Sequence, residues 1–172
     1  YPWMEFSVEM IRKGNLPLWN PYNSCGIPLI ANYQSAVFYP LNSFFYLLPF
    51  SQAFVLSAVI HLFFAGFFMY LFLKMIEVKH FGAILASVSF MFCGFLMLYI
   101  TNPATNVAVC LPLLFFLTEK LVQKRSFLYS ILLGIAIGIQ FLGGHIETSL
   151  HIISAAFLYL LFRIFIKYRR DK

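Results

Sequence analysis

Residues 51–73 read SQAFVLSAVIHLFFAGFFMYLFL, a run without a charged side chain. As a helix it would extend about 35 Å at roughly 1.5 Å per residue, which is enough to cross a hydrocarbon core of about 30 Å. Lys74 follows directly and marks its end. This stretch therefore indicates a membrane-spanning helix.

Four further apolar stretches come after it, so the chain is expected to cross the membrane five times. The predicted spans are residues 51–73, 81–100, 107–122, 127–142 and 150–166. In the fourth, Gly134 and Gly138 stand four residues apart, a spacing that lets helices approach closely. We expect this helix to be buried among the others. The sequence thus predicts an all-α, polytopic integral membrane helical bundle over residues 51–172.

Lysine and arginine residues alternate along these spans. Ten of the twelve fall on every second junction, namely Lys74, Lys79, Lys120, Lys124, Arg125, Arg163, Lys167, Arg169, Arg170 and Lys172. The junctions between them, residues 101–106 and 143–149, carry none. Because loops rich in Lys and Arg stay cytoplasmic, residues 1–50 and 143–149 are predicted to be extracytoplasmic.

Composition agrees with a membrane location. The chain is 62% hydrophobic and only 10% charged, with 22 phenylalanines in 172 residues, more apolar surface than a soluble fold of this size can bury. The net charge of +6 comes from residues that flank the spans, so we expect contacts with membrane lipid and not with nucleic acid. Three cysteines without a CxxC pair suggest neither a disulfide framework nor a zinc site.

Residues 1–50 differ in kind from the rest and are predicted to form an extracytoplasmic loop with interfacial helices. Apolar and charged residues alternate over residues 3–13, which suits an amphipathic helix. Prolines, glycines and tyrosines punctuate residues 14–46, and the amphipathic tyrosine rings suit the headgroup level. Because the chain starts at Tyr1 without an initiator Met or a first apolar span, it is expected to be an N-proximal fragment of a longer protein.

Several motifs of this opening segment resemble a known family. Residues 14–22 read GNLPLWNPY, 26–29 GIPL, 31–36 ANYQSA, 38–41 FYPL and 143–147 GGHIE. These resemble the first outer loop and a second outward motif of the bacterial YfhO-like membrane proteins, which are similar to the glycosyltransferase C superfamily. The resemblance implies a bacterial cytoplasmic membrane enzyme that takes a sugar from a polyprenyl-phosphate carrier and passes it to a cell-envelope polymer on the outer face.

The resemblance also implies a catalytic carboxylate. Enzymes of this superfamily usually place an Asp in the first outer loop, where it acts as general base on the acceptor hydroxyl. The only aspartate here is Asp171, on the predicted cytoplasmic side. The expected base therefore lies upstream of Tyr1, and Glu5 or Glu9 is the alternative. No cofactor is predicted, although a divalent metal is compatible with stabilising a departing phosphate.

Five residues are candidates for binding the donor or the acceptor: Asn20, Gln34, His145, Glu147 and Arg12. Amides bind sugar hydroxyls, and Arg12 is one of two outer cations that can meet a lipid phosphate. These residues also have structural alternatives. Arg12 can anchor the loop, and His145 and Glu147 can cap the next helix. His145, Glu147 and His151 are a poor match to metal-site spacing, so no metal site is predicted.

Other polar residues within the apolar stretches are expected to be structural. We interpret His61 as a neutral side chain hydrogen-bonded to a neighbouring helix, and Asn106 and Gln140 in the same way.

Two other function classes stay open. One is a transporter or flippase of lipid-linked sugars, which would carry discontinuous helices and charges deep in several spans. The other is a noncatalytic membrane assembly protein, supported by the Gly134 and Gly138 face.

Overall fold

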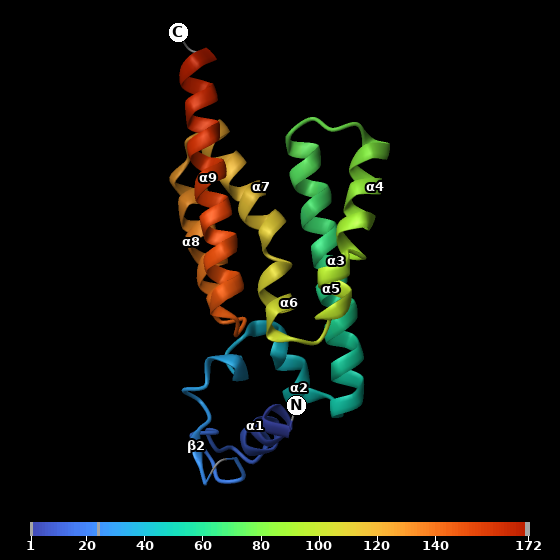
Figure 1. Ribbon diagram of the computed structural model, residues 1–172, viewed down its shortest axis with the longest axis vertical. Coiled ribbons are helices and arrows are strands. Elements are labelled where there is room, and N and C mark those ends of the chain that lie inside the picture. The colour runs from blue at the N-terminus through green and yellow to red at the C-terminus, as the bar shows by residue number, and fades with distance from the viewer. Residues whose placement is uncertain (1, 24, 171–172) are drawn as a thin grey trace.

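The computed structural model describes residues 2–23 and 25–170, so the expectations for Tyr1 and for the cytoplasmic placement of Asp171 lie outside the described residues. Figure 1 shows long helices side by side above a smaller N-terminal layer. That layer contains α1 (Pro2–Arg12), β1 (Trp19–Asn20), β2 (Ile27–Pro28), η1 (Tyr33–Ser35), η2 (Pro40–Asn42) and α2 (Ser43–Leu47). The bundle contains α3 (Phe50–Met75), α4 (His80–Met91), α5 (Gly94–Leu98), α6 (Pro103–Ala108), α7 (Leu111–Lys124), α8 (Phe127–Phe141) and α9 (Ile146–Arg170). The predicted all-α membrane bundle is confirmed.

Four helical segments of the described chain are long and apolar enough to cross a membrane. They are Phe50–Met75, His80–Leu98, Pro103–Lys124 and Ile146–Arg169. The third begins earlier than predicted because Pro103 occupies the first helical turn, where a missing N–H costs nothing, and Asn102 caps it by accepting from the Ala104 N–H at 3.0 Å. The fourth predicted span, α8, has only 15 residues, or about 22 Å at roughly 1.5 Å per residue.

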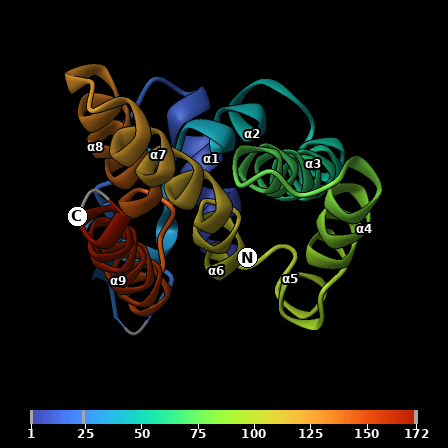
Figure 2. The ribbon, with the colours of Figure 1, turned by 90° about the horizontal axis from the view of Figure 1, so that it is seen from above.

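Two groups of helices make up the bundle. Figure 2 shows α3 with α4 on one side and α7, α8 and α9 on the other, and α7 also contacts α3. Of the apolar stretch of the α6–α7 segment, 50% is buried within the protein, whereas the share is 17–22% in the other three candidate spans. The α6–α7 segment therefore forms the centre of the bundle. Within the first group the Met91 side chain fills the space that a Cβ would need at Gly66, and this close approach explains the glycine in α3.

The predicted burial of α8 is wrong. A Cβ added at Gly134 or Gly138 would meet nothing within 4 Å, and both positions are exposed. The helix turns the opposite face inward, and Ala136 and Gln140 are its buried residues. The small-residue spacing therefore faces away from the bundle in this chain.

Residues 2–23 and 25–49, called the cap below, fold against one end of the bundle. The predicted N-terminal helix is present as α1, and Val8 packs with Phe45 of α2 and Ala53 of α3. The Arg12 guanidinium donates to the backbone carbonyls that end α2, including Phe45 O at 3.0 Å. These contacts make the cap a folded unit joined to α3.

The cap and the two neutral junctions lie at the same end of the bundle, opposite the basic loops (Figure 1). Tyr33 donates its hydroxyl proton to the Phe141 carbonyl, next to the junction at 143–149. Asn106 Nδ2 donates to the Gly143 carbonyl at 3.2 Å, which joins the two junctions. Gly144 adopts φ +92°, and a Cβ there would lie 3.0 Å from Ala36 Cβ. Segments far apart in sequence thus converge, as the charge pattern requires.

Candidate functional site

A cavity of about 340 Å³ opens between the cap and the bundle. Its lining comes from four segments that share this end of the molecule: the cap, the start of α3, the junction before α6 and the turn before α9. The lining residues are Trp3, Met4, Gln34, Ser35, Ala36, Asn42, Phe45, Phe54, Ser57, Ile100, Thr101, Asn102, Pro103, Asn106 and His145. Among these residues none is acidic and none is Lys or Arg, so the cavity is polar but uncharged.

Hydrogen bonds hold the amides of the cavity wall in place. Asn42, which is 4% exposed, donates through Nδ2 to the Ala36 carbonyl at 2.8 Å. Asn106 donates to Gly143 in the same manner. Asn42 and Asn106 are thus each fixed by a backbone partner, and a side chain fixed in this way can present its second polar atom without a further ordering cost.

His145 combines two roles that sequence analysis treated as alternatives. It stands directly before α9, and its Nδ1 accepts from the Thr148 backbone N–H at 3.3 Å and lies 2.9 Å from the Thr148 hydroxyl. It therefore caps the helix. Because Nδ1 accepts this hydrogen bond through its lone pair, the ring proton is carried by Nε2. His145 also lines the cavity, which makes it a positioned hydrogen-bond donor.

A buried polar chain beside the cavity joins the cap to the bundle. His61, 1% exposed, lies 2.6 Å from its own helix at Ser57 O through Nδ1 and 3.2 Å from the Tyr39 hydroxyl through Nε2. Tyr39 also lies 3.2 Å from the Asn106 carbonyl. The expectation that His61 bonds to a neighbouring helix is thus corrected, because its second partner belongs to the cap. Burial raises the pKa of Tyr39 above its ordinary value and keeps the hydroxyl protonated.

The structure brings Gln34 and His145 of the predicted site into this cavity, together with Asn106, which sequence analysis took as structural. The sequence feature that could have indicated Asn106 is its place in a neutral junction, three residues after the proline of the Thr-Asn-Pro breaker. Asn20 is elsewhere: it is buried, and its Oδ1 accepts from the Tyr22 N–H at 3.0 Å within a turn. Arg12 anchors α2, which is the structural alternative for this residue.

The remaining acidic candidates do not line the cavity. Glu147 is exposed in the first turn of α9, and Glu5 is exposed on α1. Glu9 is exposed and forms an ion pair with Lys13 at 2.5 Å. That hydrogen bond and charge lower the pKa of Glu9 from its ordinary value. Across the described ranges, no three His, Cys, Asp or Glu side chains gather as a metal site would require.

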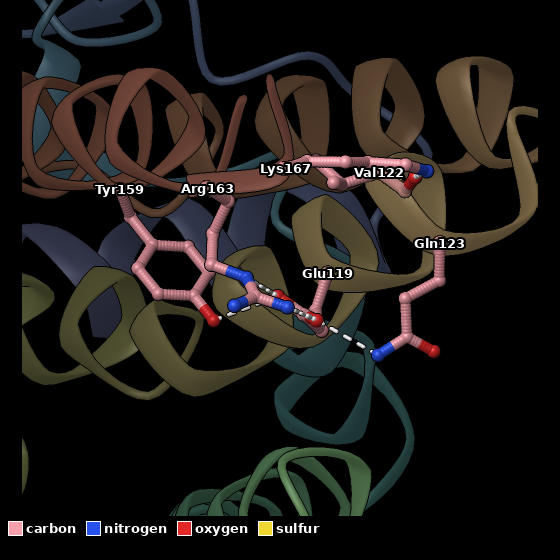
Figure 3. Close-up of polar contacts among 6 residues, drawn as sticks. All are labelled: Glu119, Val122, Gln123, Tyr159, Arg163 and Lys167. Atoms are coloured by element: carbon pink, nitrogen blue, oxygen red, sulfur yellow. Dashed lines mark hydrogen bonds and ion pairs between the residues drawn. The ribbon is translucent and has the colours of Figure 1, made fainter. Parts of the chain in front are cut away.

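A second polar cluster, at the opposite end of the bundle, was missed by sequence analysis (Figure 3). Glu119 of α7 is fully buried, and Arg163 of α9 donates to both of its oxygens, with Nε at 2.7 Å from Oε2. Tyr159 and Gln123 each donate to the same carboxylate at 2.8 Å. A buried carboxylate is tolerated only when it is paired in this way. The sequence feature that could have predicted this pair is an acidic residue, Glu119, in one predicted span and an arginine, Arg163, in another.

Gln140 departs from the structural role expected of it. It is fully buried on α8, yet neither amide atom has a hydrogen-bond partner within the described part of the chain.

Comparisons with protein-family models, with curated proteins and with solved structures find no match for this chain. Fold and site together define a multi-pass membrane helical protein with an uncharged polar cavity beneath a folded N-terminal cap.

Proposed function

We propose that this chain is part of a membrane glycosyltransferase, and that the cavity under the cap holds the sugar of a polyprenyl-phosphate carrier. The observation that supports this most directly is the shared cavity of Gln34 and His145. The two residues come from the separate motifs that resemble the outward loops of the YfhO-like proteins. The proposal places the cavity on the extracytoplasmic face of a bacterial cytoplasmic membrane, because Lys and Arg concentrate at the other end.

The chemistry of the cavity suits a sugar. Its volume of about 340 Å³ falls in the range of about 300–1,000 Å³ that small-molecule sites occupy. Amide and hydroxyl groups can bind sugar hydroxyls, and the rings of Trp3 and Phe45 offer apolar faces. An uncharged wall matches a neutral hexose, and the location at the end of the spans lets a prenyl chain stay in the bilayer.

His145 is the residue that we assign to the phosphate side of the donor. Its Nε2–H is fixed by the Thr148 contacts at Nδ1. A fixed donor stabilises charge that develops on a leaving oxygen without reorganising at the moment of reaction. No carboxylate lines the cavity among the described residues, so the wall groups named here bind and position the donor and do not act as the general base. The acceptor, a cell-envelope polymer, would approach from the open side of the cap.

The test is sugar addition in cells that produce the intact protein. Gln34→Ala and His145→Ala should each lower sugar incorporation into the envelope polymer by about tenfold or more, since a lost hydrogen bond to a charged or buried group costs about 1.5–3 kcal/mol and 1.4 kcal/mol is tenfold. Glu147→Ala, at an exposed residue that does not line the cavity, is the matched control and should leave incorporation unchanged. Equal incorporation in all three variants would exclude the proposed site.

A second candidate, a flippase of lipid-linked sugars, is favoured by one observation. The helix from His80 to Leu98 is interrupted between Met91 and Gly94, where Cys93 adopts an extended conformation. Discontinuous helices are typical of transporters. The two functions are separated by reconstituting the intact protein in vesicles with polyprenyl-phosphate hexose in one leaflet. Movement of the hexose across the bilayer without transfer to an acceptor would support the flippase.

A further inference from the structure

A groove at the basic end of the bundle, away from the cavity under the cap, has a composition that neither the fold nor the proposed function explains. It has a volume of about 490 Å³ and lies between α7 and α9. Its walls are aliphatic, formed by Leu121, Val122, Leu160 and Ile164. Its polar lining includes Arg125 and Lys167. An aliphatic trough with two cations is amphipathic along its length, as a phospholipid is.

Arg125 and Lys167 both form hydrogen bonds with the backbone at the end of α7. Arg125 adopts φ +47°, and its N–H donates to the Leu121 carbonyl at 2.9 Å, which ends the helix. Lys167 Nζ donates to the Val122 carbonyl at 2.8 Å (Figure 3). An ammonium group has three protons, so this contact leaves two for a ligand. The Lys167 contact also offsets the negative end of the α7 dipole, which would otherwise repel an anion.

The surrounding charges favour an anion as well. Lys124 and Arg169 are exposed at the same end of the bundle. The acidic residue of α7, Glu119, is fully buried and is paired with Arg163, so its charge is neutralised within the protein. The groove therefore combines two basic side chains with an apolar wall, at the end of the bundle that the charge pattern predicts to face the cytoplasm.

We propose that this groove binds one anionic phospholipid of the cytoplasmic leaflet. Arg125 and Lys167 contact the phosphate, and one acyl chain lies along Leu160 and Ile164. Basic pockets between membrane helices on the cytoplasmic side bind anionic headgroups for these reasons. The bound lipid would bridge α7 and α9, the two helices already joined by Glu119 and Arg163. The inference is independent of sugar transfer, because the two cavities lie at opposite ends.

The test measures lipid binding to the intact protein in detergent micelles by native mass spectrometry. Phosphatidylglycerol should be retained in preference to phosphatidylcholine. Arg125→Gln should weaken phosphatidylglycerol binding about fivefold, which corresponds to about 1 kcal/mol for one cation near a lipid phosphate. Lys79→Gln removes an exposed cation at the same end, on the α3–α4 junction, and should leave binding unchanged.

A second variant examines the apolar half of the groove. Ile164→Trp should fill the space between α7 and α9 and displace the acyl chain while helical content, measured by circular dichroism, stays the same. Three results would overturn the proposal: equal retention of phosphatidylcholine, equal weakening by Arg125→Gln and Lys79→Gln, or full displacement of the lipid by millimolar inorganic phosphate. The last would assign a phosphate site without a lipid.

Discussion

The Tyr39 hydroxyl lies 3.2 Å from His61 Nε2, and the two rings stack with centroids 5.7 Å apart. This contact fixes the cap to a buried position of α3, within the predicted first span. Since Tyr39 also reaches the Asn106 carbonyl, one hydroxyl links the cap to α3 and to the junction before α6. The shape of the cavity depends on this link, because all three elements contribute to its wall.

Tyr39→Phe should loosen the cap. The substitution leaves His61 Nε2 buried without its partner, and a buried polar group that loses its hydrogen bond costs about 1–3 kcal/mol. The measurement is thermal unfolding in detergent together with the rate of proteolysis within the cap. Tyr22→Phe is the matched control, because Tyr22 is 83% exposed, and it should change neither. Identical proteolysis of both variants would contradict the role of Tyr39.

Alkaline pH should destabilise the cap through Tyr46. Its hydroxyl donates to the Val37 carbonyl at 2.6 Å, and burial raises the pKa of Tyr46 to about 12. In the unfolded chain a tyrosine ionises near pH 10, so the unfolded state loses its proton first as the pH rises. The stabilisation is therefore complete below pH 10 and is lost between pH 10 and about 12.

The measurement is the unfolding midpoint of the intact protein as a function of pH, with tyrosinate absorbance followed in parallel. Tyr46→Phe removes one ionisable hydroxyl and should reduce the decline between pH 10 and about 12. If the variant and the unchanged protein decline equally over that interval, Tyr46 does not contribute to the alkaline transition.

The Glu119–Arg163 pair should behave as a unit. Glu119→Leu leaves the guanidinium without its carboxylate, and breaking a buried pair in this way costs about 3–5 kcal/mol. Arg163 is 28% exposed, which places the expected cost at the low end of that range. The double variant Glu119→Leu/Arg163→Leu should be more stable than Glu119→Leu alone, as measured by thermal unfolding in detergent. A purely additive double variant would show that the two side chains are uncoupled.

Gly66 lies on a packed helix face, whereas Gly138 lies on an open one. Gly66→Ala should destabilise the α3–α4 pair by about 1–3 kcal/mol, because Met91 occupies the space of the added methyl group. Gly138→Ala should leave the unfolding temperature of the chain almost unchanged, since nothing lies within 4 Å of the added atom. A strong effect of Gly138→Ala in membranes but not in detergent would show that α8 packs against another chain there.

Hydropathy and charge were sufficient for the bundle because a membrane span is defined by its own composition. Phe50–Met75 was predicted within two residues from apolar length and Lys74 alone. Such reasoning does not give the rotation of a helix about its axis, which depends on neighbours. For this reason Gly134 and Gly138 of α8 were assigned to the wrong face, and the pairing of Glu119 with Arg163 was missed.

The candidate site was predictable in part for a similar reason. Gln34 and His145 lie in loop motifs, and the charge pattern placed those loops at one end. Asn20 and Glu147 belong to the same motifs, but the turn at Tyr22 and the first turn of α9 direct them elsewhere. Motif membership thus indicated the segments, whereas local turns and caps decide which side chains reach the cavity.

The shared cavity of Gln34 and His145 is tested most directly by thiol labelling. In the intact protein, with Cys25, Cys93 and Cys110 replaced by Ser, Gln34→Cys and His145→Cys should both react with a membrane-impermeant reagent added to whole cells. Lys79→Cys, at the basic end, should react only after the membrane is opened. Added polyprenyl-phosphate hexose should slow labelling at positions 34 and 145 together. Labelling of these two positions from opposite sides of the membrane would contradict a common site.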